Sequence, residues 1–122
     1  MSFEADWARC APWLDAALEH AGRTHSLAHV RAAVERNEAR FWPGPRSALV
    51  ALIETDPGDR RLVIWLAGGN REEIETTMLP MAEAWGRQNR CRRALVIGRA
   101  GWERTLKSQG YAPMARIIAK DL

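Results

Sequence analysis

The fold is decided by residues 61–98, which read RLVIWLAGGNREEIETTMLPMAEAWGRQNRCRRALVIG. Leu62–Ala67 is an unbroken apolar run, typical of a strand that is covered on both faces. The glycines after it predict a turn. Apolar residues then recur at helical spacing, and Ala94–Ile97 predicts a second buried strand; the helical positions are Ile74, Met78, Met81 and Trp85. A strand, a helix and a strand in this order predict a parallel, right-handed βαβ crossover.

Two helices are predicted at the beginning of the chain. We expect a short helical element near residues 3–10 and a separate helix over residues 12–21, because Pro12 fits the first turn of a helix and breaks an interior. Gly22 is expected to end this helix. The second helix is expected to start at a cap, Thr24 or Ser26, and its apolar stripe comprises Leu27, Val30, Ala33 and Val34.

An antiparallel hairpin is predicted between these helices and the crossover. Residues 39–42 are expected to be extended, and the prolines of residues 43–46 predict a rigid turn. Residues 47–55 are rich in Ala, Leu, Val and Ile and predict a strand. The turn chemistry of residues 56–59 then returns the chain into the apolar run of the crossover.

The remaining elements complete an α/β (α+β) fold. Pro80 cannot donate to the carbonyl of Thr76, so we expect a kink inside the crossover helix. A loop is expected at residues 98–101, and a short helix over residues 102–108 that Gly110 ends. Residues 111–119 are expected to close the mixed sheet as a terminal strand.

Length and composition predict one domain over residues 1–122. The longest apolar run has six residues, too few for a membrane span, and the acidic start of the chain is unlike a signal peptide. We therefore expect a soluble, cytoplasmic protein. Cys10 and Cys91 lie far apart without ligand-like spacing, which favours two reduced thiols over a disulfide and excludes a zinc site built from thiolates.

Charge is distributed unevenly along the chain. Residues 1–85 carry 9 Lys/Arg and 13 Asp/Glu, whereas residues 86–122 carry 9 and 2. Such a basic segment suits nucleic acid, a phosphorylated ligand or an acidic protein surface, and the alternative is a solvated rim. The arginines around the last strand of the crossover would carry nucleic-acid contacts; they are Arg90, Arg92, Arg93 and Arg99.

Histidines and tryptophans suggest further sites but support none strongly. His25 and His29 have the spacing of metal ligands on one helical face, but no third ligand accompanies them. Helix-capping or solvated histidines are therefore the better interpretation, and no metal site is expected.

Six tryptophans are many for this length. Trp65 and Trp85 fall on core periods, whereas Trp7, Trp42 and Trp102 lie at element edges and either pack under loops or form a contact surface.

Several segments carry a resemblance to a known family. The order of elements resembles the acyltransferase fold of the GNAT (GCN5-related N-acetyltransferase) superfamily without its first long strand and last hairpin partner. The local sequence resembles most that of short GNAT-like proteins encoded in phage and prophage genomes, which are mostly of unassigned function. The segments that carry this resemblance are residues 41–44 (FWPG), 65–69 (WLAGG), 98–102 (GRAGW) and 110–111 (GY).

The resemblance implies a phosphate-binding turn at residues 70–75, where the family pattern is Arg/Gln-x-x-Gly-x-Gly/Ala. Both glycine positions hold glutamate here, Glu73 and Glu75, and Glu72 adds a third carboxylate that would repel a pyrophosphate. A shifted register is the alternative, with Gly68-Gly69-Asn70 as the phosphate loop and Arg71 as the counter-ion. The cofactor-binding candidates of this register are Leu66, Gly68, Gly69, Asn70, Arg71 and Arg99.

A second family motif, Asn-x-x-Ala-x-x-x-Tyr before Gly-Phe, would supply an amide for the pantetheine arm and a tyrosine that protonates the leaving thiolate. Anchored on Gly110-Tyr111, the positions fall on Arg99, Trp102 and Leu106, and none matches. Leu106 cannot donate a proton, so the sequence offers no catalytic residue of the family type. Tyr111 replaces the phenylalanine and is interpreted as a packing residue.

These observations predict a degenerate GNAT-like protein of phage or prophage type that acts through protein contacts, including those of a homodimer, and needs no cofactor. Its location would be the host cytoplasm or the virion. The first alternative is an active N-acyltransferase that uses acetyl-CoA through the shifted loop. The second is a nucleic-acid-associated or virion component that uses the basic C-terminal third.

Overall fold

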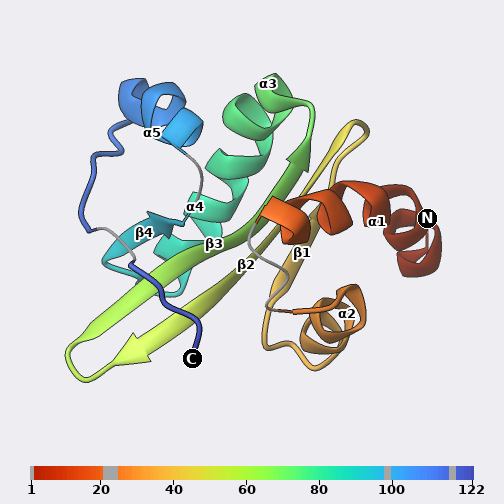
Figure 1. The fold of residues 1–122 in the computed structure, drawn as a ribbon, viewed down its shortest axis with the longest axis horizontal. Coiled ribbons are helices and arrows are strands. Elements are labelled where there is room, and N and C mark those ends of the chain that lie inside the picture. The colour runs from red at the N-terminus through yellow and green to blue at the C-terminus, as the bar shows by residue number, and fades with distance from the viewer. Residues whose placement is uncertain (1, 21–24, 98–99, 116–117) are drawn as a thin grey trace.

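A computed structural model describes residues 2–20, 25–97, 100–115 and 118–122 (Figure 1). Its centre is a four-stranded sheet in the order β1-β2-β3-β4, formed by β1 (Arg40–Pro43), β2 (Ser47–Asp56), β3 (Asp59–Gly69) and β4 (Arg93–Val96). β1 and β2 pair antiparallel, as do β2 and β3, whereas β3 and β4 pair parallel. The predicted hairpin and βαβ crossover are therefore confirmed.

Helices cover both faces of this sheet. They are α1 (Phe3–His20), α2 (Leu27–Glu35), α3 (Arg71–Glu73), a π-helical segment η1 (Ile74–Met78), α4 (Leu79–Gln88), α5 (Ala100–Leu106) and a 3₁₀ turn η2 (Lys107–Gln109). Within the described ranges, none of these helices combines the length and the apolar character that crossing a membrane requires.

The beginning of the chain is one helix, so the prediction of two elements divided at Pro12 was wrong. Trp7, Cys10, Leu14 and Leu18 are buried and recur every three or four residues across the proline, which gives α1 one continuous apolar stripe. Burial of that stripe outweighs the hydrogen bond that Pro12 removes. The predicted end of this helix at Gly22 lies outside the described residues.

The start of α2 confirms Ser26 as the cap. Its hydroxyl accepts a hydrogen bond from the backbone N–H of His29 at 3.2 Å, and its own N–H donates to Nδ1 of His29 at 3.4 Å. This reciprocal arrangement is a capping box in which a histidine takes the place of the usual Glu or Gln. His29 is thus a capping residue, in agreement with the alternative to a metal ligand.

Two apolar cores lie on opposite faces of the sheet. The first joins α1 and α2 to the sheet and includes Leu14, Leu18, Val30, Val50 and Leu66. The second joins η1, α4 and α5 to the sheet and includes Leu49, Leu62, Ile64, Met78, Ala82 and Leu106. Trp7 and Trp42 are buried within these cores, so they do not form the contact surface that was one of their two interpretations.

Pro80 sits at a change of helix type. The N–H of Leu79 donates to the carbonyl of Ile74, which is the i to i−5 pattern of a π-helix, and Pro80 then lies in the first turn of α4. A proline is tolerated in a first turn because no intrahelical partner is required there. The missing hydrogen bond therefore falls at a boundary between two helix types.

The predicted terminal strand is wrong. α5 and η2 match the expected short helix, and Gly110 ends it with φ of 92°. Residues 111–115 and 118–122 then form no strand. Tyr111 stays attached to α4, since its hydroxyl donates to Oε2 of Glu83 at 2.6 Å, and Pro113 can donate no ladder hydrogen bond. The C-terminal segment therefore runs past β4 instead of along it (Figure 1).

Candidate functional site

The site begins where β3 and β4 part. Their parallel pairing runs from Arg61–Arg93 to Ile64–Val96 and stops there, although β3 continues to Gly69. At the same point the pairing of β3 with β2 shifts register, so that Trp65 is an extra residue between Ile64 and Leu66. This is a β-bulge, which bends its strand and locally increases the twist. The bulge thus lies next to the point where the pairing of β3 with β4 ends.

A cleft of about 340 Å³ lies beyond the paired part of β3 and β4. Its volume lies within the range of about 300–1,000 Å³ that small-molecule sites span. The lining is mainly apolar and comes from β3, β4, η1 and α5; it includes Ile64, Leu66, Ile74, Val96, Trp102 and Leu106. His20, at the end of α1, is the titratable residue among the described lining residues. Sequence reasoning missed His20, because only the folded topology brings α1 to this cleft.

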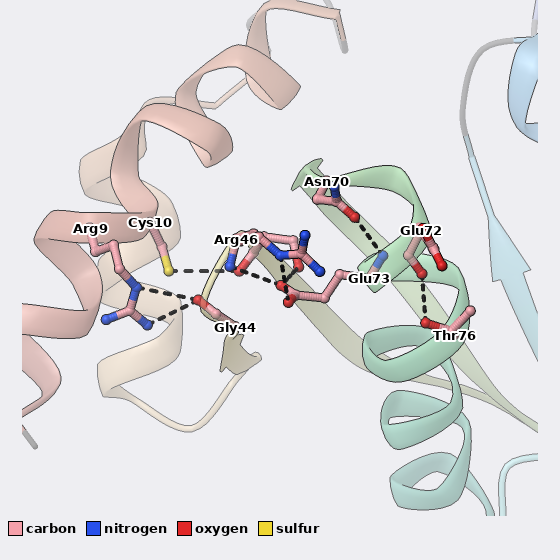
Figure 2. A network of polar contacts seen from close by, with 9 residues as sticks. Arg9, Cys10, Gly44, Arg46, Asn70, Glu72, Glu73 and Thr76 are labelled. Carbon is pink, nitrogen blue, oxygen red and sulfur yellow. Dashed lines mark hydrogen bonds and ion pairs between the residues drawn. The ribbon is translucent and has the colours of Figure 1, made fainter.

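The Glu73 side chain points toward Arg46 in the turn between β1 and β2 (Figure 2). Its carboxylate is buried and accepts hydrogen bonds from the hydroxyl of Ser47 and, at 3.0 Å, from the backbone N–H of Arg46. The Arg46 guanidinium lies 3.8 Å from its second oxygen. The Ser47 hydrogen bond, helped by these Arg46 contacts, holds the pKa of Glu73 below its ordinary value against the opposing effect of burial. The expectation that three carboxylates face an incoming phosphate was therefore wrong for Glu73.

The same corner attaches α1 to the turn between β1 and β2. The Arg9 guanidinium donates to the carbonyl of Gly44 at 3.1 and 3.3 Å, and the Cys10 thiol lies 4.0 Å from the carbonyl of Ser47. A side chain on Gly44 would collide with the Glu73 carboxylate. Helix α1, the β1–β2 turn and the start of α3 are thus held together around one buried carboxylate (Figure 2).

The two glycines of the candidate phosphate loop are explained by packing. A Cβ on Gly68 would overlap the backbone carbonyl of Trp13 in α1, and Gly69 has φ of 106° with its Cβ position against Arg46 and Ser47. A residue other than glycine would be strained at either place. Both glycines are therefore required by the close approach of β3 to its neighbours, whether or not a phosphate binds.

Asn70 and Arg71 also have structural partners. The Asn70 side chain accepts from the N–H of Glu73 at 2.8 Å, which makes Asn70 the N-cap of α3. The Arg71 guanidinium lies 5.2 Å from the ring centre of Trp102 and donates to the Thr105 hydroxyl at 3.4 Å. Arg71 therefore connects the start of α3 to α5 through a cation–π pair and a hydrogen bond.

Leu106 and Trp102 occupy the places that the family resemblance assigns to the tyrosine and to a residue of the pantetheine motif. Leu106 is 2% exposed and packs in the core, and Trp102 is half-buried beside it. Leu66 is 3% exposed and packs toward α1. Arg99, the last cofactor-binding candidate, lies outside the described residues. Of the predicted cofactor-binding residues, Leu66 lines the cleft, whereas Gly68, Gly69, Asn70 and Arg71 do not. Trp102 and Leu106 place apolar side chains where the family chemistry would need polar ones.

Titratable groups elsewhere in the described ranges give no second centre. Burial and the hydrogen bond to Glu83 raise the pKa of Tyr111 far above its usual range, so its hydroxyl stays protonated. Cys10 and Cys91 are free thiols, and burial raises the pKa of each. His25 stacks edge-on against Trp65 with 5.2 Å between ring centres. In the described part of the chain, no group of three His, Cys, Asp or Glu side chains could hold a metal ion.

The described arginines of the nucleic-acid hypothesis lie together near the start of β4. Arg90, Arg92 and Arg93 are exposed, and the pairing of β3 with β4 brings Arg60 and Arg61 beside them. Arg61 is neutralised by Glu54 and Asp56, whereas Arg60 donates to the backbone carbonyl of Asn89 at 2.9 Å. Sequence reasoning missed Arg60, because its neighbours arrive through strand pairing. Nucleic-acid binding by this group stays a prediction.

Comparison with solved structures identifies the fold. An acetyltransferase from Trypanosoma brucei superposes with a TM-score of 0.61 at 14% identity, covering 89% of this chain and 92% of that one. The chain has the fold of the GNAT-type acetyltransferases. An aminoglycoside 6'-N-acetyltransferase from Acinetobacter haemolyticus gives a TM-score of 0.56 at 14% identity over 87% and 89% of the two chains. A Thermus thermophilus protein gives 0.61 at 16% identity over 89% of each.

This likeness extends to the fold and not to the sequence. No family model and no curated protein sequence matches the chain. Acetyl-CoA is the cofactor that a GNAT fold implies when it is active, and the residues here fit it poorly. The loop glycines are required by packing, the helix cap is occupied by Asn70, and Leu106 lines the cleft in place of an acid. No catalytic step through acetyl-CoA follows from this arrangement.

Proposed function

We propose that this chain is a degenerate GNAT-like protein that acts through protein contacts and not through acyl transfer. The observation that carries the proposal is the position of Leu106, which lies buried in the cleft wall where the family resemblance requires a proton donor. Its assignment to phage or prophage proteins rests on the sequences of the short segments quoted above. The host cytoplasm or a virion is the corresponding location.

The packing of the loop supports the same proposal. A backbone loop that binds pyrophosphate needs N–H groups and a helix start free to approach the ligand. Here Asn70 caps the helix with its side chain, and its N–H donates to the carbonyl of Arg46 at 2.8 Å. Arg71, the candidate counter-ion, is engaged with Trp102 and Thr105. A cofactor would have to displace these contacts, which lowers its affinity.

Isothermal titration of the full chain with acetyl-CoA and with CoA tests the proposal. We expect no binding in the micromolar range for either ligand. Micromolar binding of acetyl-CoA would overturn the degenerate assignment. Near-UV circular dichroism of the same sample serves as the control for a folded chain, because six tryptophans in packed environments give a strong signal.

The alternative is an acyltransferase that uses the shifted loop with acetyl-CoA. The bulge at Trp65 and the 340 Å³ cleft favour it, because they supply a shaped hollow beyond the paired part of β3 and β4. In this case Arg71→Ala should abolish cofactor binding. Arg104→Ala is the matched control, since Arg104 is exposed on α5 and does not line the cleft.

A further inference from the structure

Three arginines around the start of β4 lack a carboxylate partner. Arg87 lies in the last turn of α4, and Arg92 and Arg93 lead into β4. In the described ranges, no Asp or Glu side chain forms an ion pair with any of the three, whereas the neighbouring Arg61 is paired with two carboxylates. All three line one groove of about 1,400 Å³. Their positive charge is therefore available to an anion that enters this groove.

Arg93 contacts a weak acceptor in the place where an anion would bind. Its guanidinium donates to the sulfur of Met114 at 3.4 Å. A thioether sulfur is a weak acceptor, whereas a hydrogen bond from arginine to a carboxylate or a phosphate is among the strong ones. Met114 is 62% exposed, so moving its side chain aside breaks no buried contact. An anionic group at Arg93 would thus replace a weak contact with a strong one.

The groove becomes apolar along β4. Side chains of a strand alternate between its two faces, so Arg93 and Leu95 lie on the same face. Leu95 is half-buried, and Ile97, directly after the strand, is 62% exposed; both line the groove. At about 3.3 Å per residue, the strand from Arg93 to Val96 is about 10 Å long. This wall therefore carries a cation followed by an apolar stretch.

The other walls favour one orientation of a bound anion. On the side of α5 the groove is lined by Trp102 and Leu106, which also line the 340 Å³ cleft, and by Glu103, which repels an anion there. The other carboxylate among the described lining residues is Glu83, which accepts a hydrogen bond from the Tyr111 hydroxyl at 2.6 Å. An anionic head group belongs at the arginines, and an apolar tail belongs along β4 toward α5.

We propose that this groove binds a single-chain amphipathic anion, with its carboxylate or phosphate head at Arg92 and Arg93 and its alkyl chain along β4. The charge at one end and the apolar wall beyond it match the two parts of such a molecule. A free molecule and not a bilayer is the occupant, because the groove is a hollow between α4 and residues 111–115 that a flat surface does not enter. The inference goes beyond the proposed function, because protein contacts require no such ligand.

The reactivity of Cys91 reports on the groove. Cys91 lines it, whereas the other cysteine, Cys10, is fully buried in the core. Decanoate, added below the concentration at which it forms micelles, should slow the alkylation of Cys91 by iodoacetamide, measured by mass spectrometry of the full chain. Acetate has the head without the chain, and decyltrimethylammonium has the chain with a positive head, so neither should protect Cys91. Octanoate has a shorter chain and should bind more weakly, by up to about fourfold for each methylene removed.

Two double variants test the arginines. Arg92→Gln/Arg93→Gln should raise the dissociation constant of decanoate about fivefold or more, because it removes both contacts to the head group. Both side chains are exposed, so the Tm should be unchanged. Arg36→Gln/Arg104→Gln is the matched control, since it removes the same charge at exposed positions outside the groove lining. This control should bind decanoate as the unmodified chain does.

Isothermal titration of the full chain with decanoate gives the dissociation constant independently of the thiol, and absence of binding would overturn the proposal. Equal protection of Cys91 by decanoate and decyltrimethylammonium would do the same, since the head would then be irrelevant. An equal loss of affinity in both double variants would assign the effect to net charge instead. Binding to anionic vesicles without protection of Cys91 by decanoate would assign the arginines to a membrane surface. Micromolar binding of CoA would overturn the degenerate assignment alone and leave the head-group dependence of decanoate binding in place.

Discussion

Glu73 joins the start of α3 to the turn between β1 and β2 through one carboxylate. The resemblance assigns this position to a phosphate-loop glycine, and the structure uses it instead to hold the β1–β2 turn through Ser47 and Arg46. The direction of this side chain could not be predicted from sequence. Glutamate at a helix start normally faces solvent, and only the arrival of a turn 27 residues earlier in the chain gives it partners. Comparison with the family motif therefore reveals that glutamate replaces glycine at position 73, but not that this glutamate holds the β1–β2 turn.

Replacing Glu73 with Gln should make the chain less stable in a pH-dependent way. The folded-state pKa of Glu73 lies below the ordinary 4.5, so its stabilising effect is complete above that pH and is lost as the pH falls through the folded pKa. We expect the Tm of Glu73→Gln to be several degrees lower at neutral pH. The difference from the unmodified chain should shrink as the pH falls from 5 toward 3.

Thermal unfolding at a series of pH values, followed by far-UV circular dichroism, measures both effects. Glu72→Gln is the matched control, because Glu72 is the exposed neighbour in the same helix turn. Its Tm should stay close to that of the unmodified chain at every pH. An equal Tm difference for Glu73→Gln at pH 7 and pH 3 would contradict the role of the charge.

Among the elements, those with strong local signals were predicted and those set by distant contacts were not. The apolar runs at Leu62–Ala67 and Ala94–Ile97 identify β3 and β4, and Ser26 identifies the start of α2. The bulge at Trp65 has no signal, because an unbroken apolar run lacks the alternation that would reveal an extra residue. The cleft lies beside that bulge and is lined by Trp65. Its position could therefore not be derived from the sequence, although several of its lining residues could.

α1 gives the clearest test of how packing outweighs local preference. Pro12 lies inside it and removes one helical hydrogen bond, while the buried stripe from Trp7 to Leu18 keeps the helix continuous. Pro12→Ala should raise the free energy of unfolding, by at most about 3 kcal/mol, because alanine restores the N–H and the side chain is exposed. Urea unfolding followed by tryptophan fluorescence measures the change.

Pro57→Ala provides the matched comparison for this prediction. Pro57 is exposed in the turn between β2 and β3, where proline restricts the unfolded chain and breaks no helix. We expect this variant to be slightly less stable, by about 0.4–1 kcal/mol. If both variants shifted stability in the same direction and by the same amount, the cost assigned to Pro12 in α1 would be wrong.

At the scale of the whole molecule, the fold was predicted better than its chemistry. The order of elements, the hairpin and the parallel crossover follow from the periodicity of apolar residues, and the predicted GNAT-like fold is confirmed by the solved acetyltransferases. The prediction of a terminal strand was wrong because a strand must also find a sheet edge to pair with. The sequence could not show that the Tyr111 hydroxyl is hydrogen-bonded to Glu83. Fold and function separate here because every candidate cofactor residue in the described range has a packing role.

The charge of the whole molecule leads to the last prediction. Strand pairing places Arg90, Arg92 and Arg93 at one exposed end of the sheet, with Asp and Glu neutralising Arg61 beside them. Three arginines that each contact a phosphate of a single strand should give a slope of about −2 for log affinity against log salt. We therefore expect weak binding of single-stranded DNA in a gel shift at low salt, which disappears toward physiological salt.

Changing Arg90, Arg92 and Arg93 to Gln should bring the slope of log affinity against log salt near zero. A triple change of Arg31, Arg36 and Arg104 removes the same charge elsewhere and should leave the slope unchanged; if it abolishes binding equally, net charge and not this arginine group is responsible.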